Sequence, residues 1–260
     1  EAVKASFLDV AAPLGISDIV VIPVSALVGD NVVDQSANMT WYDGPTLLEH
    51  LETVPIGLDP RDQPFRLPVQ YVNRPRTAEH PDYRGFSGRI ASGVIRVGDE
   101  IVVNPLGRKS TVTGIDVLGK PAEVAFAPQS ITLSLSDEID IVRGDVISSI
   151  AGSPLSTREV TATVCVLADS PIEKGQRLLA RFGPKTVRVI VADIVDRLDL
   201  NSLEHESHSG SLELNDVGTL VLRLADDVVV DNYDDLRTTS AFILVDDHDG
   251  STLAGGMTRC

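Results

Sequence analysis

The spacing of apolar residues changes near residue 65, and no other feature of this sequence constrains the fold as strongly. In residues 3–14, apolar side chains recur every three or four positions, whereas in residues 65–71 every second side chain is apolar. The first spacing is typical of a helix, and the second is typical of a strand with one buried face. We therefore expect a short helical region followed by a long β region.

The β region contains many short apolar segments that are separated by Gly, Pro, Asn and Asp. Segments such as "GRIASGVI", "STVTGIDV" and "SITLSLS" lie within residues 65–150, and "EVTATVCVLA", "KTVRVIVADIV" and "GTLVLRLADDVVV" lie within residues 155–260. Short strands at this spacing favour closed or nearly closed antiparallel barrels. The sequence predicts two β-barrels, joined by a linker at "AGSPLST".

Residues 1–54 have a different pattern, which predicts the order helix, strand, loop, helix. The first helix is expected to end near Gly15, and "DIVVIP" at 18–23 resembles a strand that is buried on both faces. A second helix is expected after Pro45, and residues 55–64 form a linker rich in Pro, Gly and Asp. This order is typical of the end of a doubly wound α/β domain. Such a piece cannot cover its own apolar faces, so we expect it to dock poorly, exchange its amide hydrogens fast, or associate.

Composition favours a globular cytoplasmic protein. Hydrophobic residues make up 43% of the 260 residues, and no apolar run is long enough to predict a membrane span. The N-terminal residues lack the pattern of a signal peptide. Two cysteines, Cys165 and Cys260, are too few for a disulfide framework.

The net charge of −16 is unevenly distributed. Residues 193–249 contain 15 acidic and 3 basic side chains. A phosphate backbone would be repelled by such a surface, so nucleic-acid binding through this region is disfavoured.

The sequence lacks a phosphate-binding loop. The nearest match, "PLGRKST" at 105–111, lies between two predicted strands and is interpreted as a β-turn. No Asn-Lys-x-Asp is present, and "DYRG" at 82–85 is short enough to occur by chance. We therefore expect this chain alone not to hydrolyse GTP, and we assign no catalytic residue.

Three further motifs are interpreted as structural. Arg143-Gly144-Asp145 ends a predicted strand pair in a chain without secretory features, which disfavours an adhesion role. His205 and His208 have the spacing of helical metal ligands, but they lie in a polar stretch with no further ligand, so a solvated loop and no metal site are expected. In "VDDHDGST", Val245 would occupy the first ligand position of a calcium loop, so a hairpin turn around Asp249-Gly250 is predicted instead.

Several long phrases resemble one protein family. "SALVGDNV", "WYDGPTLLEHLE", "RGFSGRIASGVIRVGDEIVV" and "STLAGGM" resemble, in this order, successive parts of translation-factor-type GTPases. "FRLPVQYVNRP", "SDEIDIVRGDVI" and "LDLNSL" are more similar to the GTPase (large) subunit of bacterial sulfate adenylyltransferase, which has a fused adenylylsulfate kinase domain in some members. "TTSAFILVD" departs mildly from the usual family wording.

The resemblance implies a mostly β fold, with the C-terminal part of a GTP-binding domain at 1–54 followed by barrels like domains 2 and 3 of elongation factor Tu. It implies that the full-length protein binds GTP and Mg²⁺ and pairs with a small catalytic subunit, which joins ATP and sulfate into adenylyl sulfate and pyrophosphate. Ser25, Ala26 and Leu27 would form the turn beside the guanine base. The phosphate loop would lie upstream of residue 1, so no cofactor is expected in this fragment.

Two other functions stay open at this point. The chain could come from an elongation factor that binds aminoacyl-tRNA through its barrels, against which the acidic charge argues. It could also be a stand-alone β-barrel interaction module whose first 54 residues are vestigial.

Overall fold

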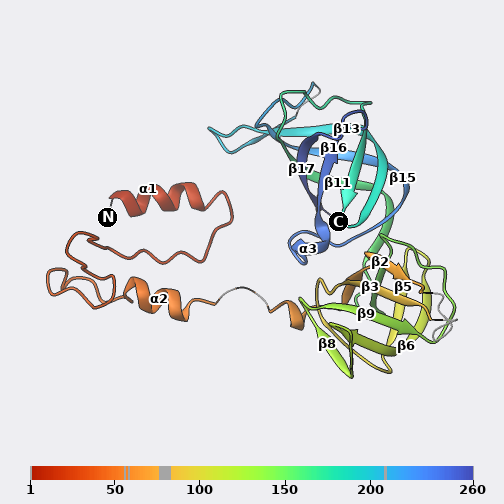
Figure 1. The fold of residues 1–260 in the computed structure, drawn as a ribbon. Helices are drawn as coiled ribbons and strands as arrows, with labels where there is room; N and C mark the ends of the chain where they lie inside the picture. The colour runs from red at the N-terminus through yellow and green to blue at the C-terminus, as the bar shows by residue number, and fades with distance from the viewer. Residues whose placement is uncertain (1, 56, 58, 76–82, 208–209, 260) are drawn as a thin grey trace. The chain divides into compact units, whose positions relative to one another are not determined.

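The computed structural model describes residues 2–55, 57, 59–75, 83–207 and 210–259. The chain divides into two compact units, residues 1–57 and residues 58–260 (Figure 1). The boundary between them lies within the predicted linker 55–64, and the limits of the three predicted domains remain predictions.

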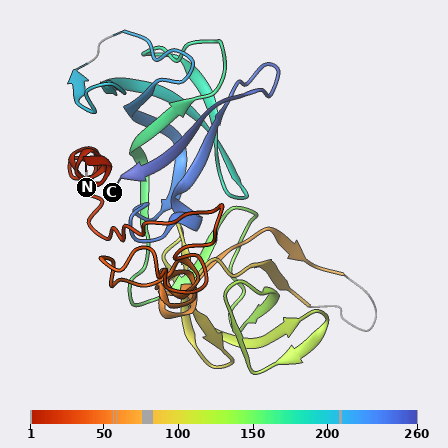
Figure 2. The same cartoon turned by 90° about the vertical axis from the view of Figure 1, so that its left-hand side faces the viewer.

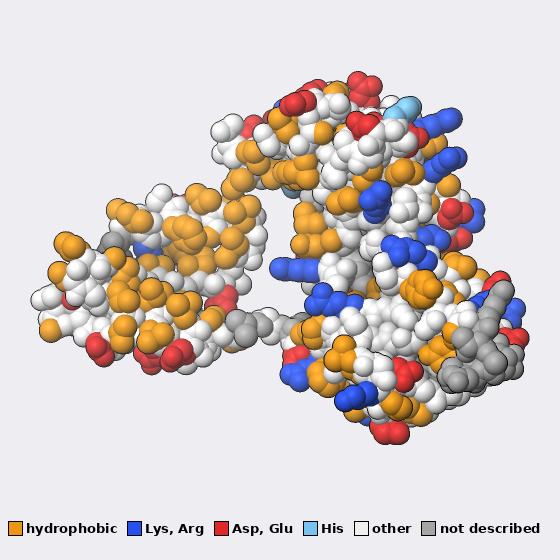
Figure 3. All heavy atoms as spheres, viewed as in Figure 1, with side chains coloured by type: hydrophobic (Ala, Val, Ile, Leu, Met, Phe, Trp, Pro, Cys, Tyr) orange, Lys and Arg blue, Asp and Glu red, His pale blue; other side chains and the backbone are white. Residues whose placement is uncertain are grey.

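The first unit contains the two predicted helices. They are α1 (Ala2–Ala11), which Figure 2 views along its axis, and α2 (Leu47–Thr53). The hydroxyl of Thr46 accepts a hydrogen bond from the Glu49 N–H at 3.2 Å and caps the N-terminus of α2. Apart from Ala11, the apolar side chains of α1 are exposed, and Figure 3 shows hydrophobic side chains spread over this unit.

The predicted strand at 18–23 is wrong. The described residues of this unit form no strand, and the only sheet-like pairing among them is an isolated bridge between Ser25 and Asp30. An apolar run becomes a strand only where a neighbouring strand pairs with its backbone groups. The described part of residues 1–57 offers no such neighbour, so the run forms no strand, and its valines are exposed.

The first barrel follows a short 3₁₀ helix, Pro60–Asp62, which lies inside the predicted linker. Its main sheet has the order β1-β10-β5-β6-β9-β3-β2, with β7 paired to β6, and β4 pairs with β8 in a separate ribbon. The strands are β1 Arg66–Pro68, β2 Tyr71–Asn73, β3 Gly85–Arg89, β4 Val94–Arg96, β5 Glu100–Asn104, β6 Arg108–Val117, β7 Lys120–Ala122, β8 Val124–Phe126, β9 Ser130–Leu135 and β10 Val146–Ser149.

One bent segment of chain connects the two ends of this sheet. β1 and β2 stand at opposite ends of the strand order but are separated in sequence only by Val69 and Gln70. The N–H of Val69 donates to the Asp145 carbonyl at 2.8 Å, and the N–H of Gln70 donates to the Ser87 carbonyl at 2.9 Å. The sheet therefore curves back on itself, as predicted for residues 65–150.

The second barrel is closed. Its strands follow the order β12-β16-β17-β11-β15-β13, and β12 also pairs with β13, which completes a ring of six; β14 pairs with the outer end of β13. The elements are β11 Leu155–Val166, β12 Arg177–Phe182, β13 Lys185–Leu198, β14 His205–Ser207, β15 Val217–Val230, α3 Arg237–Ser240, β16 Ala241–Val245 and β17 Thr252–Arg259. β11 begins at Leu155, so the predicted linker "AGSPLST" is shorter than expected.

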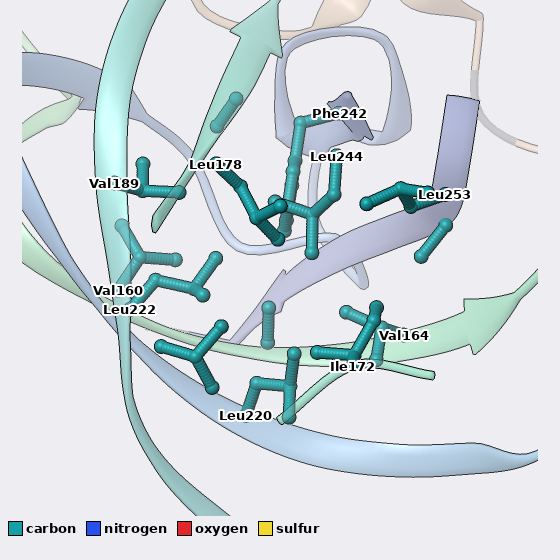
Figure 4. Close-up of a cluster of buried hydrophobic side chains, with 14 of the residues drawn as sticks. Val160, Val164, Ile172, Leu178, Val189, Leu220, Leu222, Phe242, Leu244 and Leu253 are labelled. Atoms are coloured by element: carbon teal, nitrogen blue, oxygen red, sulfur yellow. The ribbon is translucent and has the colours of Figure 1, made fainter. Parts of the chain in front are cut away.

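Each barrel has its own hydrophobic core. Alternate side chains of the strands point inward, and Figure 4 shows Val160, Leu220, Leu222 and Leu244 within the second core. The first core includes Phe65, Leu67 and Ile147. The mostly β fold with two barrels is therefore confirmed.

The alternation that identified the first strand fails at two positions. Tyr71, predicted to be inward, is exposed, and Arg66, predicted to be outward, is 3% exposed. The Arg66 guanidinium donates from Nη2 to Asp231 Oδ1 at 2.8 Å and from Nε to Asp231 Oδ2 at 3.2 Å. Arg66 is buried because its charge is paired with a residue of the second barrel, a partner 165 positions away that a local pattern cannot reveal.

Candidate functional site: the Ser25–Leu27 turn

The turn proposed to lie beside a guanine base is a compact loop. The Ser25 N–H donates to the Asp30 carbonyl at 3.2 Å, and the Gly29 N–H donates to the Ser25 carbonyl at 2.8 Å. These bonds hold the two ends of the loop together. Leu27, at its tip, has 95% of its surface exposed. The turn therefore presents its tip to solvent and not to a protein core.

Asn31 supports this turn through side-chain hydrogen bonds, a role that was not predicted from the sequence. Its side chain is 1% exposed, and its Nδ2 donates to the Pro23 carbonyl at 2.9 Å. Its Oδ1 accepts from the Ser36 N–H at 2.8 Å. The backbone of Asn31 has a φ of 53°, in the left-handed region that Asn tolerates better than most residues. The Gly-Asp-Asn sequence after the turn was the available signal for this role.

The same segment connects the turn to α2. The Leu47 N–H donates to the Asn31 carbonyl at 3.0 Å, and the Leu48 N–H donates to the Val32 carbonyl at the same distance. Asp30 Oδ1 accepts from the Ser36 hydroxyl at 2.6 Å. The start of α2 and the base of the turn therefore form one hydrogen-bonded structure, which fixes where the tip lies within this unit.

The tip offers two backbone donors. Among the described residues, the N–H groups of Ala26 and Leu27 donate to no carbonyl or side chain. These N–H groups are available to an acceptor outside the turn. The sequence holds no Gly-rich loop that ends in Lys-Ser or Lys-Thr.

Two of the motifs that were interpreted as structural lie in a turn between strands and in the protein interior. Residues 105–107 form the turn between β5 and β6, where Gly107 has a φ of 66°, as predicted. Asp145 of the Arg143-Gly144-Asp145 motif is buried, and its Oδ2 accepts from the Val142 N–H at 2.9 Å. An adhesion receptor could not reach this carboxylate. Of the "DYRG" stretch, residue 82 lies outside the described residues.

Of the two histidines with the spacing of metal ligands, the structure describes His205. His205 lies in β14 and not in the predicted loop, and its Nδ1 is 3.0 Å from Asp196 Oδ1. His208 lies outside the described residues. Asp246, Asp247 and His248 form an exposed group in the predicted turn before Gly250, with ligand atoms within 4.8 Å of one another. Exposed acidic groups of this kind are common without an ion, so we assign no metal site to it.

Two other expectations concern the cysteines and the membrane. Cys165 is a half-buried free thiol in β11, and residue 260 lies outside the described residues. Among the described residues, no helix has both the length and the apolar character needed to cross a bilayer.

The chain is 42% identical to sulfate adenylyltransferase subunit 1 of Cellvibrio japonicus over 99% of its own length and 53% of that protein. The chain is a homologue of sulfate adenylyltransferase subunit 1. The resemblance noted in the sequence is thereby confirmed over nearly the whole chain.

A second relative of this chain is the bifunctional enzyme CysN/CysC of Mycobacterium tuberculosis. It is 42% identical over 99% of this chain and 42% of that protein. The chain thus spans about half the length of the curated relatives it matches. Its residues 159–259 match the family described as GTP-eEF1A C-terminal domain-like, and these residues form most of the second barrel.

The fold of this chain is also found in a solved structure. The crystal structure of Sup35 complexed with GMPPNP aligns with a TM-score of 0.69 and 21% identity, over 91% of this chain and 57% of that one. At this identity the likeness concerns the fold alone, and it agrees with the two translation-factor-like barrels.

Proposed function

We propose that this chain is part of the GTPase subunit of sulfate adenylyltransferase. In the proposed reaction, a sulfate oxygen attacks the α-phosphorus of ATP, pyrophosphate leaves, and adenylyl sulfate forms. GTP hydrolysis in the full-length subunit would drive this unfavourable step on a separate catalytic subunit. The observation that carries the proposal is the 42% identity to subunit 1 across 99% of the chain.

The Ser25–Leu27 turn would read the guanine base. GTP, when bound to the full-length protein, would be hydrolysed, and this hydrolysis would supply the free energy for sulfate activation. In this chain, Ala26 and Leu27 would donate their backbone N–H groups to the base oxygen, while Asn31 holds the turn in place through Pro23 and Ser36. Mg²⁺ would bind with the phosphates, for which this chain supplies no recognisable loop.

A second protein would complete the enzyme. The matched relatives are named as subunit 1, which supports a partner subunit, and the bifunctional relative supports a fused kinase domain in some family members. The barrels would contact the catalytic subunit. We expect the assembled enzyme to act in the cytoplasm without nucleic acid.

A chimeric protein tests this proposal. This chain would replace the corresponding half of the Cellvibrio japonicus subunit 1, in a bacterial strain that lacks its own subunit 1 and grows on sulfate as the sole sulfur source. Restored growth is expected. A chimera that is folded and abundant but does not restore growth would contradict the proposal, and tight salt-sensitive binding of tRNA by the chain would favour an elongation factor.

Proline substitutions test the guanine-side turn in the same chimera. Ala26→Pro and Leu27→Pro each remove one N–H donor, whereas the control Leu27→Ala keeps the donor and loses little packing because Leu27 is exposed. At least one proline variant should bind GTP about tenfold more weakly than the control, the effect of losing about 1.4 kcal/mol. Equal affinity of all three variants would show that these donors do not contact the base.

A further inference from the structure

The first barrel carries a groove that the proposed reaction does not use. It consists of two hollows, of about 910 Å³ and about 410 Å³, which share Gln70 and Tyr71 as lining residues. We call them together the Tyr71 groove. The larger hollow lies over the outward face of β3 and β9 and is also lined by Pro184 from the second barrel. Because the two hollows adjoin at Gln70 and Tyr71, a ligand that occupied both would be elongated.

The lining of the larger hollow is mainly apolar. Tyr71 and Leu118 are both largely exposed, and Leu118 has a φ of 51°. Other apolar lining residues are Pro60, Pro68, Pro128, Pro184 and Ile131. Exposed apolar side chains that gather in a hollow are typical of a protein-binding surface, whereas single exposed ones are not.

Three arginines are among the lining residues of the two hollows. Arg89 lines the larger hollow, and Arg74 and Arg143 line the smaller one. The acidic lining residues are Asp116 and Asp140. The charged lining residues of the larger hollow balance, whereas the smaller hollow has two arginines and one aspartate, which in a chain with a net charge of −16 favours an acidic partner there.

The ion pairs around the smaller hollow leave it with excess positive charge. Asp140 is shared by two arginines, with its Oδ1 at 2.9 Å from Arg84 Nη2 and at 3.8 Å from Arg74 Nη2. Arg143 Nη1 donates to the Gln70 carbonyl, which carries no charge, at 3.1 Å. Among the described residues, Asp140 is therefore the carboxylate that pairs with Arg74 and Arg84, while Arg143 pairs with an uncharged carbonyl.

The groove also borders a strand edge. β2 stands at the end of the strand order and pairs only with β3 among the described strands, so its outer edge faces the smaller hollow lined by Ile141 and Arg143. An extended peptide can bind along such an edge through backbone hydrogen bonds. The geometry thus suits an extended segment that carries acidic and apolar side chains.

We propose that the Tyr71 groove binds an acidic, extended segment of the catalytic subunit. This inference rests on the proposed function, because it names the surface through which that function would reach its partner. The apolar lining and the strongly acidic chain favour a protein over a nucleic acid as the occupant. Tyr71 would serve as the apolar contact at the centre, and the arginines would steer and align the partner.

The test measures binding between this chain and the catalytic subunit from the same organism. Arg74→Glu combined with Arg143→Glu, and separately Tyr71→Ala, should each raise the Kd at least tenfold. Arg158→Glu is the matched control, because Arg158 is an exposed arginine of the second barrel that pairs with Asp227. Raising the salt concentration should weaken binding of the unmodified chain more than binding of the double variant. Melting curves establish that each variant is folded.

Hydrogen exchange of the complex separates failure of the groove from failure of the proposed function. Protection at residues 70–74 and 140–143 on adding the catalytic subunit supports the groove. A complex that forms without protection at these residues would contradict binding in the groove. An unchanged Kd in both groove variants would contradict it as well. Neither result would contradict the proposed function. Failure of the unmodified chain to bind the catalytic subunit overturns both. Binding of tRNA in the groove overturns the choice of a protein occupant.

Discussion

Arg66 and Asp231 join the two β-barrels through a two-point ion pair, in which Nη2 and Nε of the arginine contact the two carboxylate oxygens at 2.8 and 3.2 Å. Arg66 is 3% exposed, and the Asp231 side chain is 12% exposed. The Thr239 hydroxyl also donates to Asp231 Oδ2, at 2.6 Å. This contact orients one barrel against the other.

Removing the carboxylate should destabilise the two-barrel unit. Asp231→Ala leaves the buried Arg66 guanidinium without its charge partner, and breaking a buried pair in this way costs about 3 kcal/mol. Urea unfolding of the chain should show this loss. Asp227→Ala is the control, because its pair with Arg158 is exposed and should contribute at most about 1 kcal/mol. Equal effects of the two substitutions would contradict a special role for Asp231.

Two adjacent glycines of β17 should respond differently to alanine. A Cβ at Gly256 would overlap the Phe242 ring, which stacks on Phe182 with centroids 4.7 Å apart, so Gly256→Ala should cost about 1–3 kcal/mol. A Cβ at Gly255 meets no atom within 4 Å, so Gly255→Ala should change stability by less than about 0.5 kcal/mol. Thermal unfolding of both variants compares them, and a larger loss at Gly255 would refute this view of the core.

Asp145 should give a distinct pH dependence of stability. Burial raises the pKa of its carboxyl, an effect that the hydrogen bond from the Val142 N–H and the charge of Lys185 oppose. A raised native pKa means that the folded chain holds this proton more tightly than the unfolded chain. The stability from this group is therefore complete below the unfolded pKa of 3.8 and is lost as the pH rises through the native pKa.

Asp145→Asn isolates this contribution. The amide oxygen can still accept from the Val142 N–H, but the side chain no longer ionises. The free energy of unfolding of the variant minus that of the unmodified chain should increase as the pH rises from 4 towards 7, measured by urea unfolding at each pH. A difference that is constant or falls with pH would rule out a raised pKa.

The segment 19–24 should exchange its amide hydrogens quickly. No residue from Ile19 to Val24 lies in a strand, and their N–H groups have no backbone partner among the described residues. Mass spectrometry of the monomeric chain should find exchange there complete long before exchange at Val189 and Val191 in β13. Slow exchange at 19–24 in a monomer would mean that the apolar run is paired.

The two barrels were predictable because the sequence patterns that specify their strands and turns are local. Each strand carries a two-residue alternation, and turn residues such as Gly107 and Gly250 mark the chain reversals. The alternation fails at Arg66, where burial depends on a charge partner from the other barrel. No local pattern records a contact between residues 165 positions apart.

The N-terminal strand was mispredicted for the opposite reason. The sequence of residues 18–23 has the composition of a central strand, but a strand requires neighbours, and the described part of residues 1–57 has none. The Ser25–Leu27 turn was predicted from its resemblance, while its support by Asn31 was not. A buried asparagine in a left-handed conformation is recognised from its hydrogen bonds, and those become visible only in three dimensions.

The most direct test of the proposed function uses purified chimeric subunit 1 containing this chain, mixed with the catalytic subunit, ATP, sulfate and either GTP or GDP. Formation of adenylyl sulfate and pyrophosphate would be followed over time, with GTP hydrolysis recorded in parallel. We expect that GTP, and not GDP, drives adenylyl sulfate formation and that the rates of adenylyl sulfate formation and GTP hydrolysis rise together. Adenylyl sulfate formation that is unaffected by GTP, with a folded chimera bound to the catalytic subunit, would contradict it.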